Sequence, residues 1–264
     1  MRVSFLLASS KVDVCFIQET KLSSFNDVVA RSFWGGIEVD WTVSHSEGAS
    51  GGMANLWKKG SLNLNYSFKA LGYVGINVWW KSTCVNLVNI YAPCNAVARR
   101  DLWKSLVDRR NNCGGEEWCL GGDFNEITSR EERLGGVGYL NVRGMEEFRE
   151  FFVRMGVVDI PCVGGRFTWF KDNGKAMSRI DRFLVSRNLI DMWGVVDQRI
   201  GSREFSDHAP IRLNCGIIDW GPKPFRFNNT WFKHKTLKPS SMKSGSRSKL
   251  SEWETLYCLK SLRA

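Results

Sequence analysis

The sequence predicts a layered α/β body, of the α+β kind, for most of its 264 residues. Three observations predict it. Short strand-like apolar runs outnumber helical patterns, Gly-rich turns separate these runs, and no apolar run approaches the roughly 20 residues of a membrane span. Many strands with few helices favour packed sheets over a doubly wound sheet. The composition, 43% hydrophobic and 24% charged, is that of a globular protein.

The chain opens with the stretch MRVSFLLASSKVDVCFIQETK. Its first apolar part spans only residues 5–8, which is too short for a secretory leader, and a second apolar run follows at once. The helical spacing of Val3, Leu6 and Leu7 predicts a helix instead, and VDVCFIQ predicts a short buried strand at 12–18. We therefore expect a protein that is not secreted.

Further strands and helices follow in order. Apolar runs bounded by turn residues predict strands at 37–43, 52–57, 73–80, 83–91, 116–121, 166–170, 178–185 and 209–215. Helical patterns predict helices at 97–110, 143–154 and 187–192. No internal repeat is visible.

A change of composition near residue 220 divides the chain in two. Residues 1–220 are nearly neutral, whereas 221–264 hold ten Lys or Arg against Glu252 and Glu254. Pro, Ser and Lys are frequent in this second part, which predicts a basic linker with one short helix in LSEWETLYCLKSL. Such a tail suits nucleic acid, and a merely solvated tail is an equal alternative.

The cysteines indicate a reducing compartment. Eight Cys are scattered through the chain without a Cys-x-x-Cys pair. This spacing argues against a zinc site and against the disulfide framework of a secreted protein. We expect free thiols and an intracellular protein.

Several strand-like runs end in an acid, an amide, a tyrosine or a histidine. These residues are Glu19, Asn89, Tyr91, Asp123, Asn125, Asp181, Asp207 and His208. Each alone has an ordinary explanation: Asp123 as a turn residue, His208 as a structural histidine, and Asp181 as a partner of Arg179 or Arg182. Together, hard oxygen ligands suit Mg²⁺ or Mn²⁺, and an Asp–His pair suits proton transfer. The set predicts metal-assisted attack of water on a phosphate ester.

The order IQETK, NIYAP, GGDFNEI, GGRFTWF, SRIDRFLVS, SDHAPI resembles the endonuclease/exonuclease/phosphatase superfamily, of exonuclease III or DNase-I-like fold, over residues 1 to about 216. GGRFTWF, MSRIDRFLVS and PFRFNNTWFKH most resemble the endonuclease domain of plant LINE-type (non-LTR) retrotransposon polyproteins. The resemblance implies a four-layer sandwich of two packed mixed β-sheets flanked by helices. It also implies a magnesium-dependent nuclease, a hydrolase acting on DNA in the nucleus, with no membrane and no small-molecule cofactor.

The resemblance also implies roles for individual residues. Glu19 would bind the metal, and Asp207 would complete the acidic rim beside it. Asp123 would orient or deprotonate the attacking water, with Asn125 holding water or phosphate. Tyr91 would donate a hydrogen bond to the phosphate. Asp181 would polarise His208, which would face the phosphate. Thr168 and Trp169 would contact the DNA. For Trp169 a core position is an equal alternative.

The sequence departs from the family at three places. The family opens with a strand of the type apolar-apolar-Trp-Asn, which is absent before Met1, so we expect an exposed sheet edge and a lost partner for Asp123. Cys94 stands where related nucleases often have Asn, with Asn95 one step on. In such polyproteins the linker leads to a reverse transcriptase, whereas this sequence stops at Ala264.

Three functions remain open from the sequence. The first is a metal-dependent DNA endonuclease, with activity that the truncation could abolish. The second is an inactive fragment that still binds DNA through its basic tail. The third is a phosphatase or phosphodiesterase of the same superfamily with a small substrate. The FTWF segment argues against the third, and the missing strand argues for the second.

Overall fold

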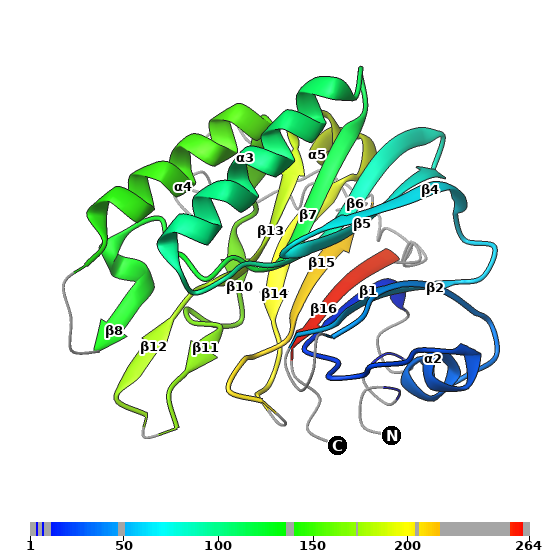
Figure 1. Ribbon diagram of the computed structural model, residues 1–264, viewed down its shortest axis with the longest axis horizontal. Helices are drawn as coiled ribbons and strands as arrows, with labels where there is room; N and C mark the ends of the chain where they lie inside the picture. Colours follow the sequence, from blue (N-terminus) through cyan, green and yellow to red (C-terminus); the bar gives the residue numbers. More distant parts are fainter. Residues whose placement is uncertain are drawn as a thin grey trace, which may run out of the picture.

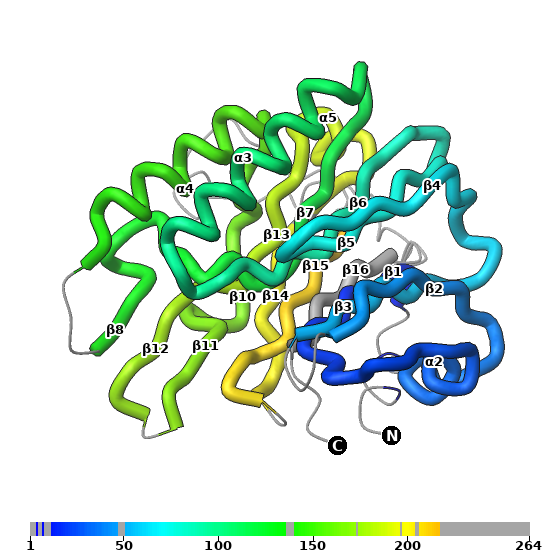
Figure 2. The backbone as a smooth tube through the Cα atoms, viewed as in Figure 1, coloured from blue at the N-terminus to red at the C-terminus, as the bar shows by residue number. Residues whose placement is uncertain are grey.

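The computed structural model describes residues 4, 7, 12–46, 51–135, 140–172, 174–203, 206–216 and 254–260. Within them the chain forms two large sheets, one smaller sheet and helices on the outer faces (Figures 1 and 2). Apart from residues 4 and 7, the helix expected near the start lies outside the described residues. In the described part, no helix has the length and apolarity needed to cross a membrane.

One sheet has six strands, and its central pair β6–β7 is parallel. The other strand pairs of this sheet are antiparallel. The strands follow one another across the sheet as β4 (Asn63–Ala70), β5 (Tyr73–Trp80), β6 (Thr83–Tyr91), β7 (Glu117–Asp123), β13 (Asp181–Ser186) and β9 (Val157–Asp159).

The second sheet has seven strands and lies against the first (Figure 1). Its order is β10 (Cys162–Val163), β14 (Val195–Ile200), β15 (Ile211–Cys215), β16 (Glu254–Lys260), β1 (Val12–Gln18), β3 (Met53–Lys58) and β2 (Val39–Ser44). A small three-stranded sheet contains β11 (Trp169–Phe170), β12 (Ala176–Ser178) and β8 (Arg133–Gly135). The short 3-10 helix η1 (Arg130–Glu132) precedes β8.

The main core lies between the two large sheets. Phe16 of β1 and Phe183 of β13 meet there with ring centroids 6.4 Å apart, and both side chains are fully buried. The helix α5 (Arg187–Trp193) joins this core through Trp193, whose ring centroid lies 4.7 Å from that of Trp80. Because strand side chains alternate between faces, each sheet has a second apolar face that helices must cover.

Those outer faces carry separate helices. α3 (Ala96–Asn112) and α4 (Val142–Met155) pack on the six-stranded sheet, and α2 (Asp27–Trp34) packs on the seven-stranded sheet (Figure 1). The result is four layers, helix, sheet, sheet and helix, which confirms the predicted fold class.

Asparagine side chains set where the helices begin. Asn95 accepts hydrogen bonds from the backbone N–H of Val97 at 2.9 Å and of Ala98 at 3.1 Å, so it satisfies two of the donors that a helix start leaves unpaired. Asn141 caps α4 in the same way through Gly144. The asparagine that follows Cys94 therefore has a structural role at α3.

The structure corrects two expectations about the C-terminal part. Residues 254–260 form the strand β16, whereas the sequence predicted a short helix within LSEWETLYCLKSL. β16 lies between β1 and β15, so the edge of β1 that was expected to be exposed is paired. The seven cysteines with described side chains are free thiols, as expected.

Replacing Asn95 with Ala removes both capping hydrogen bonds at the start of α3. We expect the free energy of unfolding to fall by about 1 kcal/mol. Urea denaturation followed by circular dichroism measures this change. Asn63→Ala, at an exposed position of β4, is the matched control and should change the free energy by less than about 0.5 kcal/mol. Equal losses in both variants would contradict the capping role.

Candidate active site

Three adjacent strands of the six-stranded sheet bring polar residues to one end. Tyr91, the last residue of β6, stands opposite Asp123, the last residue of β7. Asp181, the first residue of β13, stands opposite Asp123 on its other side. Neighbouring strands lie about 4.8 Å apart, so the register alone places these three residues side by side.

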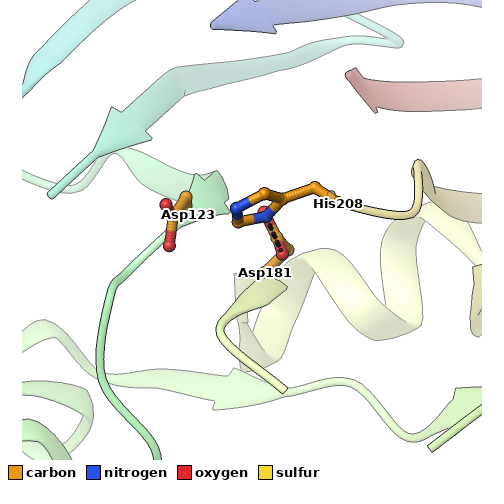
Figure 3. Close-up of side chains that lie close together, drawn as sticks. All are labelled: Asp123, Asp181 and His208. Carbon is orange, nitrogen blue, oxygen red and sulfur yellow. Dashed lines mark hydrogen bonds and ion pairs between the residues drawn. The ribbon is translucent and has the colours of Figure 1, made fainter. Parts of the chain in front are cut away.

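Asp181 holds His208, which comes from the segment just before β15. The Nδ1 atom of His208 lies 2.8 Å from the Oδ2 atom of Asp181, and both residues are buried, with 5% and 2% of their surface exposed. Figure 3 shows that the other ring nitrogen is turned toward Asp123. Ligand atoms of the three residues all lie within 4.8 Å of one another. The carboxylate therefore fixes the direction of the imidazole.

Thr168 joins the segments that carry this pair. Its hydroxyl oxygen accepts hydrogen bonds from the backbone N–H of Ile180 at 3.1 Å and of Asp181 at 3.0 Å. Its carbonyl oxygen accepts from the N–H of Ala209, the neighbour of His208, at 2.7 Å. Thr168 is fully buried, which indicates a positioning role, and its predicted contact with DNA stays a prediction.

Asp123 is fully buried and is held by Asn125. The backbone N–H of Asn125 donates to Oδ1 of Asp123 at 2.8 Å, and its side-chain amide donates to Oδ2 at 3.1 Å. The same amide donates to the carbonyl oxygen of Ala92 at 2.7 Å. Asn125 has φ of 49°, a left-handed conformation that Asn tolerates better than most residues.

The close packing just before Asp123 leaves room only for glycine at position 122. Its φ is 138°, and an added Cβ would lie 2.1 Å from the carbonyl oxygen of Ile90 and 2.2 Å from Nε2 of Gln18. Gln18 in turn donates to the side chain of Asn89 at 2.9 Å and to the carbonyl of Ile90. These buried amides join the end of β1 to β6, across the two sheets.

Glu19 follows β1 and meets Tyr91. The tyrosine hydroxyl donates to Oε1 of Glu19 at 2.7 Å, and both residues are half-buried. Glu19 has φ of 51°, where the strand ends. The predicted metal ligand and the predicted phosphate donor are therefore in direct contact.

Asp207 is held by Trp169 from the three-stranded sheet. The indole Nε1 donates to Oδ2 of Asp207 at 2.9 Å, and the hydroxyl of Ser206 donates to Oδ1 at 3.3 Å. Trp169 is half-buried against Ile180 and its neighbours. Its indole N–H is thus used inside the protein, and its predicted contact with DNA stays a prediction.

A buried ion cluster lies directly behind Asp181. Arg179 and Arg182 each pair with both Glu132 and Asp159, at 2.6–2.8 Å. Burial alone would raise the pKa of Glu132, but the hydrogen bond and charge of Arg182 outweigh it and lower the pKa to about 2. The sequence had offered these arginines as partners of Asp181, whereas the structure pairs them with Glu132 and Asp159 and pairs Asp181 with His208.

The donor set of the site fits a hard divalent cation. Carboxylates are available at Glu19, Asp123 and Asp207, and oxygen ligands are what Mg²⁺ and Mn²⁺ prefer. The buried trio could also offer ligand atoms, but Asp181 and His208 use facing atoms on each other. The expectation that Glu19 and Asp207 hold the cation, with Asp123 beside them as the base, therefore stays a prediction.

Sequence motifs found most of the site, and its supporting residues were missed. Thr168 was named as a DNA contact, and its hydrogen bonds within the site were not foreseen. The residues that were missed are Gln18, Glu132, Asp159 and Ser206. A glutamine just before Glu19 was a signal for Gln18, because a polar side chain at the end of a buried strand needs a partner. The other residues meet the site from distant segments, and no local pattern indicates that.

A family model described as Endonuclease/Exonuclease/phosphatase family matches residues 6–208, so the chain belongs to this family. A search among curated proteins found no significant match.

Solved structures with the same fold match most of the chain. An AP endonuclease, LMAP, from Leishmania major is 16% identical, with a TM-score of 0.62 and 80% of each chain covered. The endonuclease domain of TRAS1, a telomere-specific non-LTR retrotransposon, is 14% identical, with a TM-score of 0.59 and coverage of 78% of this chain and 87% of that chain. An AP endonuclease from Archaeoglobus fulgidus is 15% identical, with a TM-score of 0.60 and coverage of 79% and 91%.

Replacing Thr168 with Val keeps its shape but removes the acceptor of two buried N–H groups. We expect the free energy of unfolding to fall by about 1–3 kcal/mol. Thr168→Ser retains the hydroxyl and should lose less than the valine variant. Chemical denaturation of the three proteins tests this order, and a valine variant as stable as the parent would contradict the role assigned to the hydroxyl.

Protonation of Glu132 should make the protein less stable in acid. Its folded-state pKa is below its ordinary value, so its contribution is present above about pH 5 and is lost as pH falls toward 2. At pH 7, Glu132→Gln should lower the free energy of unfolding by about 3 kcal/mol, and the difference from the parent should shrink below pH 4. Glu147→Gln, whose partner Arg143 is 78% exposed, is the control and should show almost no difference. Urea titrations at pH 7, 4 and 3 measure both; a constant difference would contradict the ionised role.

Proposed function

We propose that this chain is a Mg²⁺- or Mn²⁺-dependent DNA endonuclease that hydrolyses a phosphodiester bond. The observation that carries the proposal is the buried pair of His208 and Asp181 facing Asp123, at a strand end whose remaining acids suit a divalent cation. Membership of the family supports phosphoester hydrolysis, and the similar structures, which are AP endonucleases and a retrotransposon endonuclease domain, support DNA as the substrate.

The residues have complementary roles in this reaction. Asp123 accepts the proton of the attacking water, while the two hydrogen bonds from Asn125 keep its carboxylate in place. The water oxygen forms a bond to phosphorus as the bond from phosphorus to the leaving oxygen breaks. Asp181 keeps the His208 ring turned toward the phosphate, where the other ring nitrogen of His208 donates a hydrogen bond to the developing negative charge.

Glu19 and Asp207 would hold the cation at the rim of the site. When bound, the cation supplies charge that stabilises the phosphate oxygens in the transition state. The Tyr91 hydroxyl, which donates to Glu19, orients that carboxylate, and in the proposed reaction it would donate to the phosphate. Trp169 orients Asp207 through its indole N–H.

Finer parts of the proposal rest on the sequence motifs. Origin in a plant LINE-type retrotransposon, a nuclear location and a basic segment at 221–264 that leads toward a reverse transcriptase and includes the strand β16 remain proposals. Most of that segment lies outside the described residues. Its excess of ten basic over two acidic side chains would strengthen DNA binding at low salt.

Replacing His208 with Ala should lower the rate of nicking by at least about 100-fold, because a group that stabilises the transition state is lost. Supercoiled plasmid with purified protein and Mg²⁺ measures nicking by conversion to the open-circular form. His45→Ala, at an exposed position, should nick at the parent rate, and EDTA should stop the reaction in every variant.

The same assay separates the proposal from the other two functions. A folded protein that retards plasmid DNA in a gel but leaves it intact would refute the nuclease and leave a binding fragment. Turnover of a small phosphate ester without nicking would indicate a phosphatase. Nicking at an undiminished rate by the His208→Ala protein would contradict the role of the histidine.

A further inference from the structure

A strand from the far end of the chain occupies the interior of the seven-stranded sheet. β16 runs parallel to β1, in register from Val14 opposite Leu256 to Gln18 opposite Lys260. It is antiparallel to β15 on its other side, from Ile211 opposite Cys258 to Cys215 opposite Glu254. Figure 1 shows β16 as the red arrow between these two strands. Within the described residues, β16 is thus the only link between β1 and β15.

The sequence separation between β15 and β16 is far longer than a hairpin requires. β15 ends at Cys215 and β16 begins at Glu254, whereas an antiparallel hairpin needs a loop of only about two to five residues. The length of the connection alone does not fix β16 beside β15. The backbone pairing with both neighbours must therefore supply the specificity.

The position between β1 and β15 requires a strand. In β1, Cys15, Phe16 and Ile17 are fully buried, and in β15 Leu213 is fully buried as well. If β16 were absent, backbone N–H and C=O groups of both strands would lose their partners in the middle of the protein. Each buried group left unpaired costs about 1–3 kcal/mol.

The sequence of β16 suits this position. ETLYCLK has four consecutive apolar residues, Leu256 to Leu259, between a polar start and a terminal lysine. A continuous apolar run is typical of a strand that is covered on both faces. The surrounding segment, by contrast, is rich in Ser and Lys.

We propose that the space between β1 and β15 is a binding site for an extended peptide of the pattern of Glu254–Lys260. This chain's own C-terminal segment is its occupant, docked as a separable strand by β-strand addition. The same segment supplied as a free peptide therefore binds whenever the tethered copy cannot.

Docking would also affect the candidate active site. β1 leads directly into Glu19, and His208 directly precedes β15, so β16 sets the distance between the two segments. This consequence rests on the proposed function. Peptide binding itself does not, so it can be tested without any activity.

The first experiment uses the full chain with Tyr257→Pro, because proline removes a backbone donor in the middle of β16. A fluorescently labelled synthetic peptide of residues 252–264 should bind this variant, as measured by fluorescence anisotropy. It should bind the parent chain and the Tyr257→Phe chain at least about 100-fold more weakly, because a tethered strand competes at millimolar effective concentration. The peptide carrying Tyr257→Pro should not bind.

A folded Tyr257→Pro chain that ignores the peptide would overturn the proposal, and so would equal binding to the parent chain. Ser244→Pro, in the connection to β16, controls for the proline itself and should behave like the parent. An unfolded Tyr257→Pro protein beside a folded Ser244→Pro protein would support the requirement for the strand.

Hydrogen exchange on the parent chain gives an independent result. The amides of β1 and β15 should exchange as slowly as those of the central strand β7. Exchange as fast as in the edge strands β2 and β4 would show that the position beside β1 is open and would overturn the proposal.

Discussion

The register of three strands, β6, β7 and β13, is the constraint on which the candidate active site depends. It places Tyr91, Asp123 and Asp181 side by side at one end of the six-stranded sheet. A slip of one residue would turn each side chain to the opposite face. The register is held by burial, because β7 and β13 are buried along almost their whole lengths between the inter-sheet core and the two covering helices.

The alternation of side chains along β13 places the Asp–His pair and the supporting ion cluster on opposite faces of the strand. Asp181 and Arg182 are neighbours in sequence and so point to opposite faces. Asp181 orients His208, whereas Arg182 and the nearby Arg179 bind Glu132 and Asp159. The two arginines are thus balanced by Glu132 and Asp159 and do not compete with His208 for the carboxylate of Asp181. Thr168 adds a neutral anchor to the same turn.

The sequence predicted the parts of the site that lie at strand ends and missed those set by distant contacts. Asp123, Asp181 and His208 follow or precede apolar runs, so pattern alone indicated a common edge. The hydroxyl of Thr168 finds its partners more than ten residues away, through a small sheet that no periodicity announces. The strand β4 was missed because it is exposed along almost its whole length and has no buried apolar run, and the helix α2 because eight residues are too few for a clear helical period. β16 was missed because a short apolar run fits a helix as well as a strand.

The strongest sequence argument for an inactive fragment was a missing strand and a missing partner for Asp123. β16 removes the first half of that argument, because β1 has a paired neighbour on each side. The argument from a missing partner for Asp123 weakens too. Asp123 receives two hydrogen bonds from Asn125 and follows Gly122, whose close packing against Ile90 and Gln18 leaves the backbone little freedom. A carboxylate held by its own turn needs less help from another strand, which supports the proposed nuclease function over the alternative of a fragment that only binds DNA.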